Sequence, residues 1–318
     1  ATSSGLTQLK VSSLVVSGTS IFAGMEEGGM FLSTNNGANW AAINTGLSNQ
    51  DIITIGVNSS TIFAGTRGNG IFSTSNNGAN WIEANTGLLG SHTQSLAVSG
   101  STMYAGTFLG GVFSTSNNGN LWANVSAGLT DKNIRALTIS SANIFAGTFP
   151  GGMFLSSNNG SSWTPINTGL TNTKVLCLAS SGTTVYVGTN GGGAFLSTNA
   201  GSSWSPINTG LTQNKVASLA LKGDTLFAGT QDGLFLSTTN GVSWTEVSTG
   251  LTTTAITALA FSGPNVFAGS GGGGVFLSSN LGASWTAINN GLNNIYVNTF
   301  AISGAHIFIG TWGDGVFY

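Results

Sequence analysis

The sequence contains few charged residues. Only 5% of the 318 residues are charged, with 7 Lys or Arg and 9 Asp or Glu, and the formal net charge is -2. A typical soluble domain has about 25% charged residues. Nucleic-acid binding depends on clusters of Lys and Arg that neutralise phosphates, so this composition argues against a nucleic-acid partner. Charge repulsion between copies is weak, which favours self-association.

The chain also lacks a second cysteine and any long hydrophobic run. Cys177 alone cannot form an internal disulfide or a cysteine metal cluster, and its apolar surroundings predict a small buried side chain. No apolar stretch approaches the roughly 18–20 residues of a membrane-spanning helix, so membrane insertion is not expected. Neither metal-ligand spacing nor a phosphate-binding glycine loop is present, and no cofactor or metal is predicted. The small polar start at residues 1–5 fits a processed secreted protein as well as an arbitrary boundary, and we expect a secreted or cell-surface location.

The spacing of tryptophan and the abundance of glycine indicate a repeat in the sequence. The chain has 49 glycines, and seven of its eight tryptophans recur at intervals of 41 or 40 residues. These seven are Trp40, Trp81, Trp122, Trp163, Trp204, Trp244 and Trp285. Each repeat contains four short apolar segments between Gly, Asn and Ser turns, as in residues 216–221, 225–229, 234–237 and 243–247. Four strands in a repeat of this length are typical of a propeller blade, so we predict an all-β fold, a β-propeller.

The ends of the chain decide the number of blades. The second-strand glycine occurs eight times, from Gly24 to Gly310, whereas the tryptophan-bearing fourth strand occurs seven times. Residues 4–7 match the end of a fourth strand, as in residues 45–48, and seven periods of 41 with one of 40 exceed the chain by nine positions. We therefore predict one domain of eight blades over residues 1–318. The eighth blade is shared between residues 292–318 and 1–7, and an N-terminal strand joins the C-terminal blade. A seven-bladed propeller is the alternative.

The turn before each of these tryptophans carries a specific pattern. It reads Ser-Thr-Asn-Asn-Gly-Ala-Asn-Trp over residues 33–40 and recurs in seven repeats. This resembles the Asp-box, or BNR repeat, Ser-x-Asp-x-Gly-x-x-Trp, of sialidase-like, sortilin-like and photosystem II assembly-factor-like β-propellers and of xyloglucan-active glycosidases. Asn replaces the Asp in six repeats and Thr239 replaces it in the sixth. The resemblance implies a fold element on the face away from a binding site, and it does not imply sialidase activity.

The residue types of this turn have physical reasons. We expect the short Asn side chain to hold the turn by bonding backbone amides two residues on. Gly37 permits a positive φ. The tryptophan ring is expected to pack between sheets.

Positions that differ between otherwise similar repeats are where a binding site could be encoded. The hairpins between second and third strands vary most, and a second variable ring lies four residues after each Gly-Leu pair. Both sets are expected on one face, with the second ring at the mouth of the propeller channel. The candidate ligand-binding residues are Trp312, Glu26, Glu27, Asp314, Asp51, Phe108, Phe149 and Tyr296.

Two groupings among these candidates suggest different ligands. Trp312 beside Glu26 and Glu27 would place an aromatic ring next to carboxylates, which suits a sugar or a cation. An exposed apolar patch, typical of a contact surface, is predicted for Phe108, Leu109, Phe149 and Pro150. The alternative for each of these residues is a solvated hairpin tip.

Catalysis is not expected. The sialidase-like propellers use three arginines to bind the substrate carboxylate, whereas this chain has only Arg67 and Arg135. A glycosidase needs two carboxylates about 5–10 Å apart, and adjacent residues such as Glu26 and Glu27 point in opposite directions along a strand. We predict a non-catalytic, lectin-like extracellular binding or scaffold propeller that presents one face to a glycan or protein. A self-assembling surface or matrix protein and a glycan-active hydrolase are the alternatives.

Overall fold

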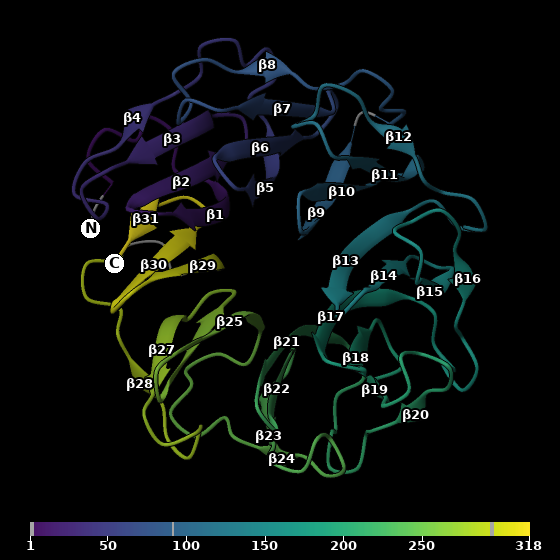
Figure 1. The fold of residues 1–318 in the computed structure, drawn as a ribbon. Helices are drawn as coiled ribbons and strands as arrows, with labels where there is room; N and C mark the ends of the chain where they lie inside the picture. The colour runs from purple at the N-terminus through teal and green to yellow at the C-terminus, as the bar shows by residue number, and fades with distance from the viewer. Residues whose placement is uncertain (1–2, 91, 293–295) are drawn as a thin grey trace. The chain divides into compact units, whose positions relative to one another are not determined.

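The computed structural model describes residues 3–90, 92–292 and 296–318 (Figure 1). All regular secondary structure in these ranges is β, in eight antiparallel sheets. The fold is that of an eight-bladed β-propeller, so the prediction from the repeat is confirmed and the seven-bladed alternative is wrong. None of the described residues forms a helix that could cross a membrane.

Blades 1 to 4 each contain four strands. Blade 1 contains β1 (Val11–Ser17), β2 (Ser20–Met25), β3 (Gly29–Ser33) and β4 (Ala41–Ala42). Blade 2 contains β5 (Ile52–Asn58), β6 (Thr61–Thr66), β7 (Ile71–Thr74) and β8 (Ile82–Glu83). Blade 3 contains β9 (Thr93–Ser99), β10 (Thr102–Thr107), β11 (Gly111–Thr115) and β12 (Ala123–Asn124). Blade 4 contains β13 (Ile134–Ser140), β14 (Asn143–Thr148), β15 (Gly152–Ser156) and β16 (Thr164–Pro165).

Blades 5 to 7 repeat this order, and blade 8 has three strands. Blade 5 contains β17 (Val175–Ser181), β18 (Thr184–Thr189), β19 (Ala194–Ser197) and β20 (Ser205–Pro206). Blade 6 contains β21 (Val216–Lys222), β22 (Thr225–Thr230), β23 (Leu234–Ser237) and β24 (Thr245–Glu246). Blade 7 contains β25 (Ile256–Ser262), β26 (Asn265–Ser270), β27 (Gly274–Ser278) and β28 (Thr286–Ala287). Blade 8 contains β29 (Val297–Ser303), β30 (His306–Thr311) and β31 (Val316–Phe317).

The chain divides into two compact units. Unit 1 comprises residues 1–124 and 290–318, which form blades 8, 1, 2 and 3, and unit 2 comprises residues 125–289, which form blades 4 to 7. In unit 1 the first strands β29, β1, β5 and β9 are successive neighbours, and in unit 2 the strands β13, β17, β21 and β25 are. The single-domain organisation over residues 1–318 stays a prediction.

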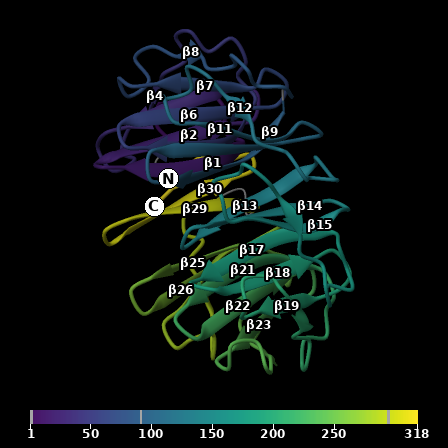
Figure 2. The same ribbon diagram turned by 45° about the vertical axis from the view of Figure 1, so that its right-hand side comes forward.

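Adjacent sheets within each unit lie side by side (Figure 2), and the side chains of the hydrophobic core fill the space between them. Between blades 1 and 2, Phe22 and Met30 of blade 1 pack against Ile62, Phe72 and Trp81 of blade 2. Equivalent clusters lie between blades 2 and 3, 4 and 5, 5 and 6, and 6 and 7. The second strand of each blade contributes to the core on both faces, which explains its run of apolar residues without polar alternation.

The seven repeating tryptophans are buried between sheets, as predicted. Within each unit, indole N–H groups also donate across to the preceding blade: Nε1 of Trp122 donates to the carbonyl oxygen of Ala84 at 2.8 Å. Nε1 of Trp285 donates to that of Val247 at 2.7 Å. Each such ring therefore fills the core and ties two neighbouring blades together.

The turns before these tryptophans share one hydrogen-bond pattern. In blade 1, the Ser33 hydroxyl donates to Oδ1 of Asn35 at 2.9 Å and accepts from the amide of Gly37 at 2.8 Å. Oδ1 of Asn35 accepts from the amide of Asn39 at 3.0 Å, so the bonded amide is four residues on and not two as expected. The reason is that Asn36 and Gly37 both have positive φ, 55° and 81°, which turns the chain back over the side chain.

The sixth repeat, in which Thr239 replaces the asparagine, keeps this hydrogen-bond pattern. Oγ1 of Thr239 accepts from the amide of Ser243 at 3.2 Å, which is the role of the Asn side chain elsewhere.

Blade 8 is completed by contacts from the N-terminal segment. Residues 3–7, the described part of the predicted N-terminal strand, contain turns and no strand, and the position equivalent to Ala42 of β4 is residue 1, which lies outside the described residues. Beyond it, the Ser3 hydroxyl lies 3.1 Å from the carbonyl oxygens of Asp314 and Val316 and donates to them. The amide of Trp40 donates to the carbonyl oxygen of Ser4 at 2.9 Å, as the other tryptophans do to their preceding blades.

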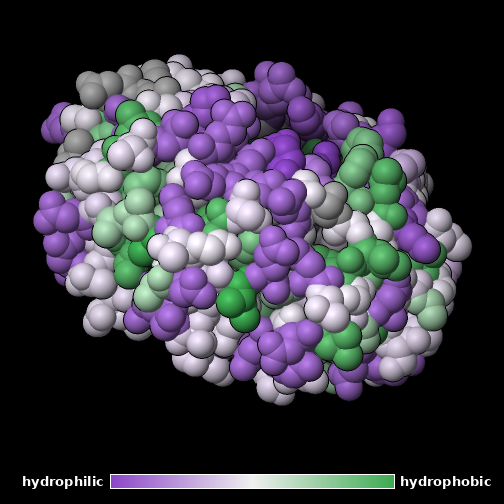
Figure 3. All heavy atoms as spheres, turned by 90° about the horizontal axis from the view of Figure 1, so that it is seen from above, coloured by the Kyte–Doolittle hydropathy of each residue, from purple (hydrophilic) through white to green (hydrophobic). Residues whose placement is uncertain are grey.

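The surface reflects the low charge of the sequence. The face drawn in Figure 3 carries small groups of hydrophobic side chains among hydrophilic ones. Single exposed apolar residues are normal on soluble proteins, so only a grouped set of them carries functional meaning.

Candidate functional site

The two variable sets of residues lie beside each other. In each of the four blades of unit 1, the amide of the first hairpin residue donates to the carbonyl oxygen of the residue that precedes the first strand. The pairs are Glu26 to Lys10, Arg67 to Asp51, Phe108 to His92 and Trp312 to Tyr296, each at 2.9 Å. Side chains from both predicted positions are therefore brought to the same edge of each sheet.

Asparagine side chains hold these hairpins in place. Oδ1 of Asn44 accepts from the amide of Met30 at 2.7 Å, and its Nδ2 donates to the carbonyl oxygen of Gly28 at 3.3 Å. Asn85 makes the same two bonds to Ile71 and Asn69, at 2.8 and 2.9 Å. In blade 8 the equivalent position is Ser3, whose hydroxyl bonds the backbone of the Trp312 hairpin. We call these side chains the hairpin clamps.

A β-bulge in every first strand adds a further side chain to this edge. The register of β1 and β2 steps from Val11 to Ser13, which leaves Ser12 as the extra residue. Ile53 and Asn298 are the extra residues of β5 and β29. A bulge re-aims the side chain of the extra residue and breaks the strict alternation of the strand.

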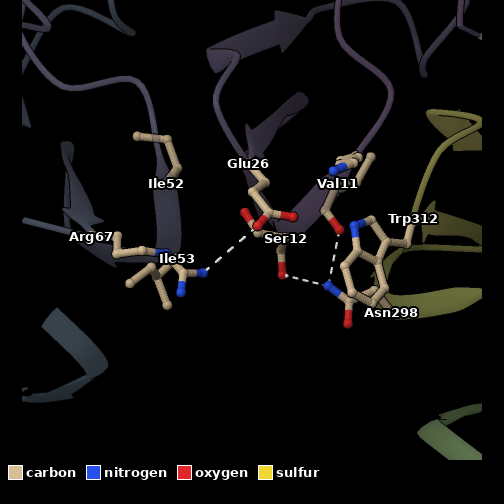
Figure 4. Close-up of a pocket in the computed structure, with 9 residues that line it drawn as sticks. Val11, Ser12, Glu26, Ile52, Ile53, Arg67, Asn298 and Trp312 are labelled. Atoms are coloured by element: carbon tan, nitrogen blue, oxygen red, sulfur yellow. Dashed lines mark hydrogen bonds and ion pairs between the residues drawn. The ribbon is translucent and has the colours of Figure 1, made fainter. Parts of the chain in front are cut away.

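The hairpin residues, the residues before and at the start of the first strands, and the bulge residues enclose a pocket in unit 1 (Figure 4). Its volume is about 460 Å³, within the range of about 300–1,000 Å³ typical of small-ligand sites. The lining residues are Lys10, Val11, Ser12, Glu26, Ile52, Ile53, Arg67, Asn298 and Trp312. The pocket therefore combines an indole, an amide, a hydroxyl, an aliphatic wall and charges of both signs.

Arg67 links the two carboxylates at one end of the pocket. Its Nε lies 2.9 Å from Oδ2 of Asp51, and its Nη2 lies 4.0 Å from Oε1 of Glu26. The other Asp51 oxygen, Oδ1, is buried without a hydrogen-bond partner. The site has two acidic side chains, Glu26 and Asp51, and two basic ones, Arg67 and Lys10, so its formal charge is balanced. Such a site suits a ligand without strong net charge.

Aromatic rings form the opposite end. Trp312 is 47% exposed, and the ring of Tyr296 packs edge-on against it with centroids 5.2 Å apart. Nζ of Lys10 lies 6.0 Å from the centre of the Trp312 ring. The amide Nδ2 of Asn298 donates to the carbonyl oxygens of Val11 and Ser12, at 3.0 and 3.4 Å, which fixes its orientation at the pocket wall.

The structure brings some of the predicted residues together and leaves others apart. Trp312 and Glu26 line the pocket, Tyr296 supports Trp312, and Asp51 holds Arg67. Glu27 and Asp314 belong to the same hairpins but are not lining residues.

The exposed patch predicted for Phe108, Leu109, Phe149 and Pro150 is divided between the two units. In unit 1, Phe108 is 44% exposed and packs against His92, with ring centroids 5.7 Å apart. In unit 2, Phe149 lies under the guanidinium of Arg135, at 5.7 Å from its centre. A joint patch of the two stays a prediction.

Sequence reasoning missed Ser12 and Asn298 as lining residues. Their repeat position is variable along the chain, with Ile53, Gln94 and Arg135 at equivalent places, and this variation was a usable signal. Within the described ranges no three His, Cys, Asp or Glu side chains gather as metal ligands would. Cys177 is half-buried, so the prediction of a buried side chain is only partly met. Desolvation of its thiol raises the pKa to about 12, and its Sγ lies 3.6 Å from the carbonyl oxygen of Val216.

Comparison with known proteins supports the propeller fold. A family model described as the DUF6242 beta propeller domain matches residues 165–301. No curated protein sequence matches the chain. The computationally designed protein Ika8 has a TM-score of 0.76 at 16% identity, covering 97% of this chain and 95% of its own. YCF48 bound to D1 peptide has a TM-score of 0.60 at 15% identity, covering 82% of this chain and 91% of its own.

Two longer proteins are matched over part of their length. The extracellular domain of a hybrid two-component system from B. thetaiotaomicron has a TM-score of 0.64 at 20% identity, covering 86% of this chain and 38% of its own. A GH74 xyloglucanase from Xanthomonas campestris has a TM-score of 0.63 at 17% identity, covering 96% of this chain and 58% of its own. The similar structures thus include an extracellular domain and an enzyme, and at these identities they show the fold alone.

Proposed function

We propose that this chain is a non-catalytic binding module of the Asp-box type that works at the cell surface or outside the cell. Its ligand occupies the pocket of Trp312, Glu26 and Arg67. The observation that carries the proposal is the grouping, in one cavity of unit 1, of an exposed indole, an oriented amide and a balanced set of charges. Such a mixture of apolar surface and a few placed polar groups is typical of ligand sites.

The chemistry of the pocket favours binding over hydrolysis. Glycoside hydrolysis uses two carboxylates that face each other across the scissile bond. Glu26 is the acidic residue among those that line the pocket, and the nearby Asp51 carboxylate bonds Arg67. Glu26 and Arg67 instead offer an acceptor and a set of donors on rigid hairpins.

The test is a binding screen with two probe sets. Printed glycans and a displayed library of random peptides are offered to the wild-type protein and to a Trp312→Ala, Glu26→Ala double variant. The matched control is Asn190→Ala, Gln231→Ala in unit 2, at the equivalent first hairpin positions of the adjacent blades 5 and 6. We expect a ligand that the control retains and the pocket variant loses. The proposal is wrong if the pocket variant binds as wild type does, or if the protein hydrolyses a glycan and Glu26→Gln abolishes that activity.

A further inference from the structure

Three large apolar side chains are grouped in and beside blade 3. Leu89 stands where the described equivalents are Ser48, Thr130, Thr171, Thr212, Thr252 and Thr7. Phe108 stands where blades 1, 2, 5 and 6 have Glu26, Arg67, Asn190 and Gln231, and where blades 4 and 8 have Phe149 and Trp312. Leu109 stands where blades 2, 5, 7 and 8 have Gly68, Gly191, Gly272 and Gly313. All three side chains are exposed, Leu89 by 65%, Phe108 by 44% and Leu109 by 64%.

The backbone of Leu109 shows that folding does not call for this leucine. Its φ is 62°, in the left-handed region that disfavours side chains with a Cβ. Four equivalent hairpins use glycine there, at φ between 104° and 128°, and blade 1 has the polar Glu27 at φ 60°. Leu109 is thus strained and exposed at a position where glycine is available, and strain of this kind is concentrated at functional sites.

The three side chains belong to one surface. The backbone of Leu89 packs on the blade 3 hairpin, since a Cβ added to Gly110 would lie 2.4 Å from the carbonyl oxygen of Leu89. Phe108 and Leu109 are adjacent in that hairpin. We call Leu89, Phe108 and Leu109 the apolar patch.

The apolar patch is continuous with the pocket. The backbones of Arg67 and His92 form a β-bridge, and the His92 ring packs against Phe108. The backbones of Trp312 and Lys10 form the corresponding bridge at the other end. Blades 8, 1, 2 and 3 therefore present one row of side chains, which begins at Trp312 and ends at Leu109.

We propose that this row binds an extended protein segment, with backbone and polar groups in the pocket and an aliphatic or aromatic side chain on the apolar patch. The proposal rests on the proposed function and names the ligand class of the same site. Exposed leucines offer a sugar neither a flat stacking face nor a hydrogen bond, whereas they bury well against an apolar side chain. Apolar anchors in the middle of a polar surface are typical of protein contacts.

The experiment measures binding and stability in the same variants. A peptide selected from the displayed library is titrated into wild type, Leu109→Gly and Leu89→Thr, both of which restore the residue found in other repeats. The control is Leu281→Asn, which removes an exposed leucine at φ 55° from a unit 2 turn where blade 1 has Asn36 at φ 55°. Thermal unfolding of every variant is recorded alongside.

We expect Leu109→Gly to weaken peptide binding about tenfold or more, since a leucine contact is lost, while its melting temperature stays the same or rises. Leu281→Asn should bind as wild type does. Unchanged affinity in both Leu109→Gly and Leu89→Thr, with loss in the Trp312 variant, overturns this inference and leaves the pocket standing. Binding of glycans alone overturns the ligand class and leaves the proposed function, whereas binding of neither probe set overturns both.

Discussion

Unit 1 and unit 2 are built on the same blade but differ in what their hairpins carry. Most of the exposed large hydrophobic side chains lie in unit 1, including Trp312, Phe108 and Leu109, whereas Val242 and Leu281 represent unit 2. Unit 1 contains five acidic and two basic residues, net -3, and unit 2 contains four acidic and five basic residues, net +1, which together give the net charge of -2. The scaffold is repeated and the surface chemistry is not.

This difference separates residues that specify the fold from residues that specify a ligand. Buried tryptophans and hairpin clamps recur in both units with the same partners. Hairpin tips and bulge residues change from blade to blade. Substitutions in the first class should affect both units alike, and substitutions in the second should affect binding in unit 1 alone.

The largest effect is expected for the buried tryptophans. Trp122→Ala in unit 1 and Trp285→Ala in unit 2 remove matched rings, which pack edge-on against Phe63 and Phe227 at 6.3 and 6.4 Å. Each should lower the free energy of unfolding by about 3–5 kcal/mol, because a large cavity opens and an indole hydrogen bond is lost. Urea unfolding of the two variants measures this loss of free energy. A change below about 1 kcal/mol in either variant would contradict the equivalence of the two scaffolds.

A smaller effect is expected for the hairpin clamps. Asn85→Ala in unit 1 and Asn208→Ala in unit 2 each remove two hydrogen bonds, to Ile71 and Asn69 or to Ala194 and Gly192. Each should cost about 1–3 kcal/mol, because backbone groups lose their partners. Only Asn85→Ala should also weaken ligand binding, since its hairpin carries Arg67. Equal loss of binding in both variants would show that the comparison between the units is wrong.

Adding a unit 1 feature to unit 2 should cost stability without adding binding. Gly191→Leu places a leucine at the position of Leu109, on a backbone with φ of 104°. The free energy of unfolding should fall by about 1–2 kcal/mol, because a side chain is forced into a left-handed conformation. Leu109→Gly should change it in the opposite direction. If both substitutions destabilise the protein, the Leu109 backbone is not strained.

The smallest effect concerns the single thiol, which lies in unit 2. Because burial raises the pKa of Cys177 to about 12, the reactive thiolate is scarce at every pH below that value. The folded protein should therefore react little with iodoacetamide at pH 8, and fully after unfolding in urea. With one cysteine in the chain, thiol labelling reports the opening of unit 2 alone. Rapid labelling of the folded protein would show that this site is open.

The repeat made the fold predictable because the same physical requirement occurs in every blade. Trp81 and its equivalents, spaced at one period, had to fill the same space between sheets, and eight copies of the second-strand glycine gave the number of blades. Trp312 and Glu26 could be placed at one edge because hairpins of successive blades must share a face. Their meeting in one pocket follows from that register.

The rest of the site depended on geometry that a period does not contain. Ser12 and Asn298 reach the pocket through β-bulges, which no local residue pattern announces. The choice of Asp51 and Glu26 as partners of Arg67 depends on side-chain reach, within blade 2 for Asp51 and to the neighbouring blade 1 for Glu26. The Asn35 side chain bonds the amide four residues further on because two successive residues, Asn36 and Gly37, have positive φ. The sequence predicted a positive φ for Gly37 only.

The hairpin clamps have a consequence for how such a protein can change over time. Asn44, Asn85 and Ser3 bond backbone atoms of their hairpins, so nothing in the clamp reads the identity of the residue at the tip. Tips can accumulate substitutions one blade at a time while the support beneath them stays intact. The same scaffold could accept grafted tip sequences in the laboratory, with each blade acting as an exchangeable cassette for selecting new specificities.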